Sequence, residues 1–238
     1  MAAIPLQHEP EIEYPDSDGK PIAETPLHLD VMVHLIQGLQ SHFADDPDVY
    51  VGGNMLLYYE VGKLSRVAPD VFVARGVPKG DRDVYLLWRE PRAPCFILEV
   101  TSAATREEDE TWKKALYAQF GVEEYFLFDP RGEYLEPRLQ GLCLTGGEYQ
   151  PLPLAADGSL IGQTIGIAFR PEGKALRMID LKTDRLIPTY SEVKAIALAA
   201  EAARKAAEEW AEAETRAVEA EARFRALAEE LERLQRQP

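Results

Sequence analysis

Residues 95–130 read CFILEVTSAATREEDETWKKALYAQFGVEEYFLFDP, and they carry the clearest pattern of secondary structure in the chain. Two apolar runs, Cys95–Val100 and Val122–Phe128, are rich in the β-branched and aromatic residues typical of strands. Between them, Thr105–Glu108 fits a capping box at the start of a helix, and Gly121 is placed to end that helix. A strand, a helix and a strand at this spacing favour parallel pairing of the two strands.

The chain before this stretch predicts a helix followed by short strands. Thr25 is a candidate N-cap with Pro26 at the first helical position. Apolar residues recur every four positions at Leu27, Val31, Leu35, Leu39 and Phe43. Four strand-like runs follow at Val49–Val51, Met55–Val61, Val67–Ala74 and Val84–Trp88. We therefore expect an α/β core with a central sheet flanked by helices.

The chain after this stretch divides into two regions. From Gly132 to Pro188, short strand-like runs alternate with glycine turns, which predicts a β-rich and peripheral part. Cys95 and Cys143 lie in apolar runs without a CxxC pattern, so we expect two buried structural thiols. The boundary between a core at 1–190 and a C-terminal segment at 191–238 follows from a change in composition.

The C-terminal segment predicts one long amphipathic helix. From Ser191 to Gln237 it contains no glycine or proline, and Ala, Glu and Arg dominate. A heptad frame places residues 196, 203, 210, 217, 224 and 231 at a positions and 199, 206, 213, 220, 227 and 234 at d positions. A solvated single helix is the alternative, but the apolar seam favours a coiled coil and self-association as a homodimer or higher oligomer.

Composition bounds the classes of function. The 238 residues are 46% hydrophobic and 28% charged, as in a globular protein. Because no segment reaches the roughly 20 apolar residues of a membrane span and the N-terminus has no leader pattern, we expect a cytoplasmic protein without membrane contact. The net charge of −15 opposes nonspecific binding of nucleic acid, although basic and acidic residues are balanced from Val61 to Ala115.

Two carboxylates interrupt runs that otherwise predict buried strands. Asp70 lies in Pro69–Asp70–Val71–Phe72–Val73, and Glu99 lies in the run that ends at Thr101. An unpaired buried carboxylate costs several kcal/mol, so a cation is expected between them. Because Mg²⁺ and Mn²⁺ prefer hard oxygen ligands, the pair predicts a divalent-metal site.

Lys113 is expected at the same site. If the helix folds back along the strand, Glu99 lies about 10 Å below the turn at ~3.3 Å per strand residue. Lys113 lies about 10 Å along the helix at ~1.5 Å per residue. The three side chains would then form a hydrolytic site, with Lys113 orienting or deprotonating a water. An ordinary ion pair from Glu99 to Lys113 or Lys114 is the alternative, and the spacing alone slightly favours it.

These motifs resemble a known family in their order and spacing. Pro69–Asp70, Glu99–Ser102, Thr105–Arg106, Asp109, Lys113, Tyr117 and Gly121–Pro130 are similar to the Uma-two family of bacterial restriction-endonuclease-like proteins. That family is assigned to the PD-(D/E)XK nuclease superfamily, and the resemblance covers roughly residues 22–188. It implies a restriction-endonuclease-like core with a mixed central sheet flanked by helices, in which Asp70 and Glu99 bind the metal.

The chain departs from the superfamily pattern in two places. The lysine of the superfamily stands two residues after the acid, where this chain has Thr101, so Lys113 must act from a migrated position. Ala103 replaces a proline that is common in the family. The resemblance also implies a further acid from the first helix, for which Glu24 is the nearest candidate and Asp30 a poorer one.

The remaining polar residues carry weaker expectations. We interpret His28, His34 and His42 as surface or capping residues, because their spacing is no ligand pattern. We expect Asp109 to pair with Lys113 along the helix. Tyr117 and Tyr125 are expected to pack behind the site. A phosphate-facing surface could include Arg66, Lys79, Arg82, Arg89 and Arg106, and a solvated face is an equal alternative.

The sequence therefore leaves three hypotheses of function. The first is an endonuclease that hydrolyses DNA with Mg²⁺ or Mn²⁺ through Asp70, Glu99 and Lys113, as a dimer. The second is an inactive nuclease fold that serves as a scaffold and assembles through its C-terminal coiled coil. The third is a sequence-specific restriction enzyme, which we rank lowest because the chain shows no separate recognition domain.

Overall fold

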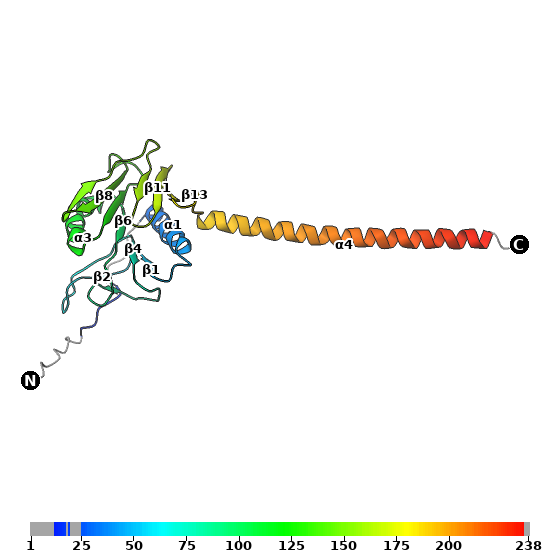
Figure 1. Ribbon diagram of the computed structural model, residues 1–238, viewed down its shortest axis with the longest axis horizontal. Helices are drawn as coiled ribbons and strands as arrows, with labels where there is room; N and C mark the ends of the chain where they lie inside the picture. Colours follow the sequence, from blue (N-terminus) through cyan, green and yellow to red (C-terminus); the bar gives the residue numbers. More distant parts are fainter. Residues whose placement is uncertain (1–11, 18, 20–24, 236–238) are drawn as a thin grey trace, which may run out of the picture. The chain divides into compact units, whose positions relative to one another are not determined.

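The computed structural model describes residues 12–17, 19 and 25–235 of the chain. The chain forms two compact units, Met1–Ile187 and Pro188–Pro238 (Figure 1). Among the described residues, none of the helices is both long and apolar enough to cross a membrane.

A six-stranded mixed sheet forms the centre of the first unit. Its strands, in spatial order, are β1 (Val49–Gly52), β4 (Val71–Arg75), β6 (Phe96–Val100), β7 (Glu124–Phe128), β8 (Leu139–Thr145) and β9 (Glu148–Pro151). Strands β6 and β7 pair in parallel, with Glu99 opposite Leu127, and the other neighbours are antiparallel. The expected mixed sheet and the expected parallel pair are both confirmed.

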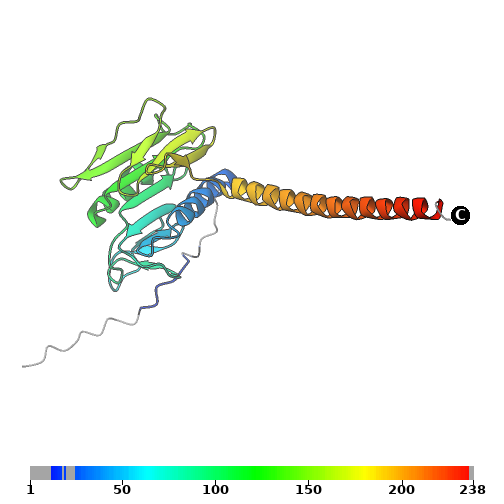
Figure 2. The same ribbon diagram turned by 45° about the vertical axis from the view of Figure 1, so that its right-hand side comes forward.

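Helix α1 (Pro26–His42) covers one face of this sheet (Figures 1 and 2). Thr25 caps it as expected, since its hydroxyl accepts a hydrogen bond from the backbone N–H of His28 at 3.3 Å. The buried seam that includes Val31, Leu35 and Leu39 packs in one core with alternate residues of β4 and β6. The expected first helix is therefore confirmed.

The opposite face of the sheet is covered by the helical segment that follows β6. It consists of α2 (Arg106–Glu108), the π-helical turn η1 (Asp109–Lys113) and α3 (Lys114–Phe120). Gly121 ends it in the left-handed conformation with φ 76°, which glycine adopts without strain. The expected capping box does not form, because the Thr105 hydroxyl accepts from the backbone N–H of Ser102 instead.

One expected strand is divided in two. The run Val67–Ala74 forms the end of β3 (Arg66–Val67) and most of β4, with Pro69 and Asp70 between them. Proline cannot donate to a strand ladder, so the pairing breaks at this point. Strand β3 joins a small three-stranded sheet with two further strands, β2 (Leu57–Tyr58) and β5 (Tyr85–Leu86).

The region 132–188 is β-rich as expected, but it is not peripheral. It contributes β8, β9 and a second sheet made of β10 (Leu160–Gly162), β11 (Ile167–Glu172), β12 (Ala175–Asp180) and β13 (Arg185–Leu186). Phe169 and Met178 are fully buried in the core beneath α1. The prediction of two buried thiols is half correct, since Cys95 is buried and Cys143 only partly so.

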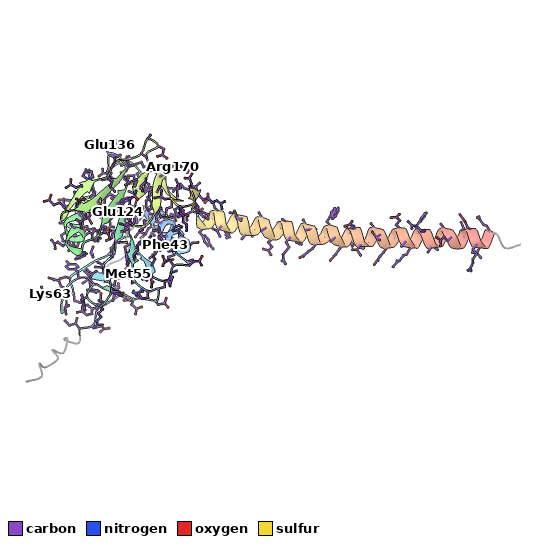
Figure 3. The ribbon with its side chains drawn as sticks, in the orientation of Figure 1. Phe43, Met55, Lys63, Glu124, Glu136 and Arg170 are labelled. Atoms are coloured by element: carbon purple, nitrogen blue, oxygen red, sulfur yellow. The ribbon has the colours of Figure 1, made fainter. Side chains whose placement is uncertain are left out.

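The second unit consists mainly of helix α4 (Tyr190–Gln235), 46 residues long. It matches the long helix expected from the composition. Its large apolar side chains, including Trp210 and Phe224, are exposed. Figure 3 shows side chains that project outward along this helix.

Candidate functional site

A cavity of about 410 Å³ opens at the edge of the sheet where β6 and β7 end. Because parallel strands end at the same edge, the loops after β6 and β7 meet there. Its walls come from the start of α1, the segment before β4, the loop Val100–Thr105, and the loop that includes Arg131. Asp70 and Lys113 also line it. The cavity thus brings together segments that are far apart in the sequence.

Asp70 is held at the inner end of the cavity, directly before β4. The backbone N–H of Val100 donates to Asp70 Oδ2 at 2.7 Å. In return, the backbone N–H of Asp70 donates to Glu99 Oε2 at 3.2 Å. The two expected carboxylates therefore lie side by side, Asp70 directly before β4 and Glu99 on the antiparallel neighbour β6, and share one hydrogen-bond network.

The loop after β1 packs against the backbone of Asp70. An added Cβ at Gly53 would lie 2.2 Å from the backbone carbonyl oxygen of Asp70 and 2.5 Å from Ile36 Cδ1. Neither distance is possible for a side chain, so only glycine fits here. The next residue, Asn54, donates its backbone N–H to the Pro69 carbonyl at 2.8 Å and lines the cavity. Gly53 therefore lets the loop support the backbone of Asp70.

Glu99 is fully buried, and its neighbours come from the helical segment on the same face of the sheet. The Tyr117 hydroxyl donates to Glu99 Oε1 at 2.7 Å. Lys113 Nζ lies 3.2 Å from Glu99 Oε2 and 2.8 Å from Asp109 Oδ1. The expected alignment of Lys113 with Glu99 and the expected pairing of Asp109 with Lys113 are both confirmed.

The π-helical turn positions this cation. Asp109 and Lys113 begin and end η1, and both are buried while the residues between them are not. Isolated π turns inside α-helices occur frequently at functional sites. The Tyr125 hydroxyl donates to the Asp109 carbonyl oxygen at 2.9 Å and so anchors the turn to β7. The sequence predicted a helix here but not this widened turn.

Burial dominates the electrostatics of the network. Burial raises the pKa of Glu99 to about 8, against the opposing effect of the Lys113 charge, and Asp70 and Asp109 raise it further. Burial also raises the pKa of Asp109. Burial alone would lower the pKa of Lys113, but the charges of Glu99, Asp109 and Asp70 raise it above its ordinary value.

The raised pKa of Glu99 favours a neutral side chain, whereas the raised pKa of Lys113 favours a charged one, so the two shifts disagree about whether the ion pair is charged. A protonated Glu99 would attract Lys113 weakly, whereas a raised pKa of Lys113 requires anionic neighbours. We favour a charged pair, because the 3.2 Å approach of Lys113 and the donated Tyr117 hydroxyl both stabilise a carboxylate. Lys113 is therefore a cation in the lining of the cavity.

His28 is the principal residue that the sequence analysis missed. It was expected at the surface or in a cap, but it is 6% exposed and lines the cavity. Its Nε2 lies 3.3 Å from Asp70 Oδ1. A signal was present, because His28 precedes the buried Val31 and Leu35 by three and seven positions and so shares their face of α1.

The remaining candidate residues differ in whether they line the cavity. Thr101 lines the cavity and is 2% exposed, and its Oγ1 has no hydrogen-bond partner in the described part of the chain. Asp30 is exposed and does not line the cavity. Glu24 lies outside the described residues. Tyr117 packs behind the site as expected and also contacts Glu99 directly.

The basic residues expected on a phosphate-facing surface do not line this cavity. Lys79 donates to the carbonyl oxygens of Phe43 and Ala44. Arg82 pairs with Glu90, and Arg106 pairs with Glu110. Arg66 and Arg89 are also absent from its lining.

Arg131 is the basic residue that lines the cavity together with Lys113. Its loop is built around the buried Asp129, whose carboxylate accepts backbone N–H bonds from Arg131, Tyr134 and Leu135 at 2.9, 2.6 and 3.2 Å. Burial opposes the charge of Asp129, but these bonds outweigh it and lower its pKa. The Asp129–Pro130 pair that ends β7 is therefore a loop anchor.

Asp70, which lines the cavity, and the fully buried Glu99 are the carboxylates that could hold a divalent cation. Among residues 12–17, 19 and 25–235, no group of three or more His, Cys, Asp or Glu side chains is arranged to hold a metal. The carboxylates of Asp70 and Glu99 are hard oxygen ligands, and the unbonded Thr101 hydroxyl is a further oxygen in the lining of the same cavity as Asp70. Mg²⁺ binds through one or two carboxylates and keeps its other waters, so two are sufficient.

The comparisons with known proteins identify the family. A solved structure titled "Crystal structure of a putative nuclease belonging to DUF820 from Anabaena variabilis ATCC 29413" is similar, with a TM-score of 0.45 and 12% identity over 60% of this chain and 75% of that one. No curated protein matches the chain. The model of the Uma2 family, described as "Putative restriction endonuclease", matches residues 1–170. The chain belongs to the Uma2 family.

Proposed function

We propose that this protein is a divalent-metal-dependent endonuclease that hydrolyses phosphodiester bonds in DNA. The observation that carries the proposal is the network of Asp70, Glu99 and Lys113, in which Asp70 and Lys113 line the cavity and the buried Glu99 contacts both. Two carboxylates on adjacent strands beside a buried ammonium are a costly arrangement, and buried charge is commonly kept where it serves a function. The family description is consistent with this chemistry.

The carboxylates of Asp70 and Glu99 would hold Mg²⁺ or Mn²⁺, with the Thr101 hydroxyl as an additional oxygen. When bound, the ion lowers the pKa of a water and neutralises charge on the phosphate. Both carboxylates are fixed by the backbone N–H groups of the neighbouring strand, so they need little reorganisation to bind a cation.

Lys113 supplies a fixed positive charge at the reacting phosphate. Its Nζ lies 3.2 Å from Glu99 and 2.8 Å from Asp109, and these charges raise its pKa, so we assign the ammonium as a hydrogen-bond donor and charge stabiliser. The sequence left two roles open for Lys113, orienting a water or deprotonating it, and this proposal adopts the first. His28 holds the orientation of Asp70 through the 3.3 Å contact from the other face of the sheet.

The mouth of the cavity favours an anionic substrate despite the acidic chain. Arg131 lies there on a loop anchored by Asp129 and can contact a phosphate outside the reacting centre. The helix α4 carries part of the excess acid, in a unit separate from the cavity. Together, the Arg131 guanidinium and the Lys113 ammonium supply two cations for neighbouring phosphates of one strand.

The test combines metal binding with cleavage on the same samples. Mn²⁺ is titrated calorimetrically into the wild type, Asp70→Ala and Glu99→Ala, and a supercoiled plasmid is then incubated with each protein and Mg²⁺. The proposal expects binding to be lost in both variants and nicking to be lost in both and in Lys113→Ala. Absence of metal binding by the folded wild type would overturn it.

An inactive scaffold is the second candidate, and one observation favours it. Lys113 lies within 3.2 Å of Glu99 and 2.8 Å of Asp109, so the network is already neutralised in part without a metal. On this account the network is a structural ion pair that holds the helical segment to the sheet. Full stability without metal, together with no cleavage at any metal concentration, would favour the scaffold.

A further inference from the structure

Helix α4 exposes large apolar side chains at the seam of its heptad frame. Ile196, Trp210 and Phe224 at a positions are 65%, 71% and 76% exposed, and Leu227 and Leu234 at d positions are 65% and 56% exposed. The helix is long enough for six heptads, more than the three or four that sustain a coiled coil. Such a seam is costly to leave in water.

The sizes of the seam residues follow an uneven pattern along the helix. Trp210 and Phe224 alternate with Ala203 and Ala217 at the a positions. The first four d positions are all alanine, and only the last two are leucine, at residues 199, 206, 213, 220, 227 and 234. A partner must therefore offer small side chains opposite the large ones.

A parallel second copy in register does not meet this requirement. In a parallel pair each core residue meets its own copy, so Trp210 would face Trp210 one heptad from an Ala203 pair and an Ala217 pair. The distance between two helix axes follows the size of the side chains at the contact. A layer of two tryptophans and a layer of two alanines require different distances between the helix axes, and the axes cannot change their distance over one heptad.

An antiparallel second copy meets it in one register. In an antiparallel pair an a residue faces a d residue of the other helix, and residue numbers opposite each other have a constant sum. When Trp210 faces Ala220 of the second copy, the same register places an alanine opposite each other large residue in the middle of the seam. The further pairs are Phe224 with Ala206, Leu231 with Ala199 and Leu227 with Ala203.

We propose that α4 pairs with α4 of a second copy of this chain as an antiparallel coiled coil in this register. The exposed portions of the large seam residues amount to about 700 Å² per copy, near the ~800 Å² per partner of a stable interface. The register also overlaps the helices almost completely, since Ile196 near one end faces Leu234 near the other.

Charges flanking the seam do not choose the orientation, but they offer a test of it. In the antiparallel register Glu209 faces Arg223 of the second copy, and this contact occurs twice. Arg216 and Glu214 each meet their own copy near the centre, which offsets the gain. In a parallel pair Glu209 would instead face Glu214. Changing Glu209 therefore affects the two orientations in opposite directions.

Antiparallel pairing has a consequence for the assembly that does not depend on the proposed nuclease activity. The first unit ends at Ile187, and α4 begins at Tyr190. The two N-terminal units are thus joined to opposite ends of the paired helices, which are on the order of 70 Å long at ~1.5 Å per residue. A parallel pair would join both units to the same end.

The orientation is tested by cross-linking two variants of the full chain that each carry one introduced, exposed cysteine. Cys143 is replaced by serine in both, since Cys95 is buried, and Ala203→Cys and Leu227→Cys are made separately, one with a size tag. A disulfide needs Cβ atoms about 3.5–4.5 Å apart. The proposal expects cross-links between the two variants and none within either, because two copies of residue 203 lie roughly 36 Å apart.

The dimer dissociation constant, measured by sedimentation, supplies the second readout. Glu209→Arg is expected to weaken the dimer roughly tenfold, and adding Arg223→Glu is expected to restore it. Glu208→Arg, at an outward position, is the matched control and leaves the constant unchanged. A monomeric wild type, cross-links within Ala203→Cys alone, or a tighter dimer in Glu209→Arg would each overturn the proposal.

Discussion

The backbone N–H of Asp70, directly before β4, donates a hydrogen bond at 3.2 Å to Oε2 of Glu99 on the neighbouring strand β6. The bond ties the two carboxylates to one rigid element. It also means that the Glu99 side chain has a structural partner besides Lys113 and Tyr117. Each substitution at this network therefore has an effect on stability and an effect on binding, which measurements can separate.

Glu99→Gln removes the charge of this side chain and keeps its shape, so it separates the two contributions. The amide oxygen can still accept hydrogen bonds, so the unfolding free energy should change by no more than about 1–2 kcal/mol. Because a neutral amide is a poor ligand for Mn²⁺, affinity should fall at least about tenfold. Denaturant unfolding and calorimetry on one preparation give both numbers. Unchanged Mn²⁺ affinity would contradict the assignment of Glu99 as a ligand.

Lys113→Met is expected to destabilise the fold by about 3–5 kcal/mol, because it leaves the carboxylates of Glu99 and Asp109 buried without their cation. The double variant Lys113→Met with Glu99→Gln should recover part of this loss. Urea unfolding measures each free energy. Lys114→Met, one position along and half-buried, is the control and should cost under about 1 kcal/mol. If the double variant loses as much unfolding free energy as Lys113→Met alone, the coupling between Lys113 and Glu99 is refuted.

His28→Ala is expected to weaken Mn²⁺ binding and plasmid nicking while the protein stays folded. The side chain fixes Asp70 Oδ1 at 3.3 Å, and loss of such an outer partner typically costs about 10–100-fold in affinity or activity. His34→Ala, on the same helix but away from the cavity lining, is the control. Equal effects of the two substitutions on Mn²⁺ affinity would show that His28 acts only through the stability of α1.

Asp129→Asn is expected to destabilise the loop that carries Arg131, by about 1–3 kcal/mol at neutral pH, because the amide nitrogen cannot accept the backbone N–H bonds. The hydrogen bonds lower the folded-state pKa of Asp129, so its stabilisation is present above the unfolded value of about 3.9 and is lost as pH falls through the lower folded value. Unfolding of both proteins between pH 7 and pH 2.5 should show the difference in stability shrinking only at the acid end. A constant difference would contradict the assignment.

Local patterns in the sequence were sufficient for the main elements and for three site residues. The four-residue spacing of α1, the strand–helix–strand unit around residues 95–128 and the seam of α4 were each predicted, because periodic burial leaves a periodic trace in the chain. Asp70 and Glu99 stood out since a charge inside an apolar strand is costly. Lys113 followed from matching the rise per residue of a helix to that of a strand.

Tertiary contacts decided the rest. His28 meets Asp70 only because α1 crosses the sheet at that edge, and no local pattern encodes this crossing. The π turn at Asp109–Lys113 and the burial of the region around Phe169 likewise depend on neighbours that are distant in sequence. The periodic pattern of apolar residues along the chain determined the main helices and strands, and the two carboxylates in apolar runs marked the candidate site, because both signals are local. The packing of separate elements determined which groups satisfy these carboxylates, because those contacts lie between residues far apart in the chain.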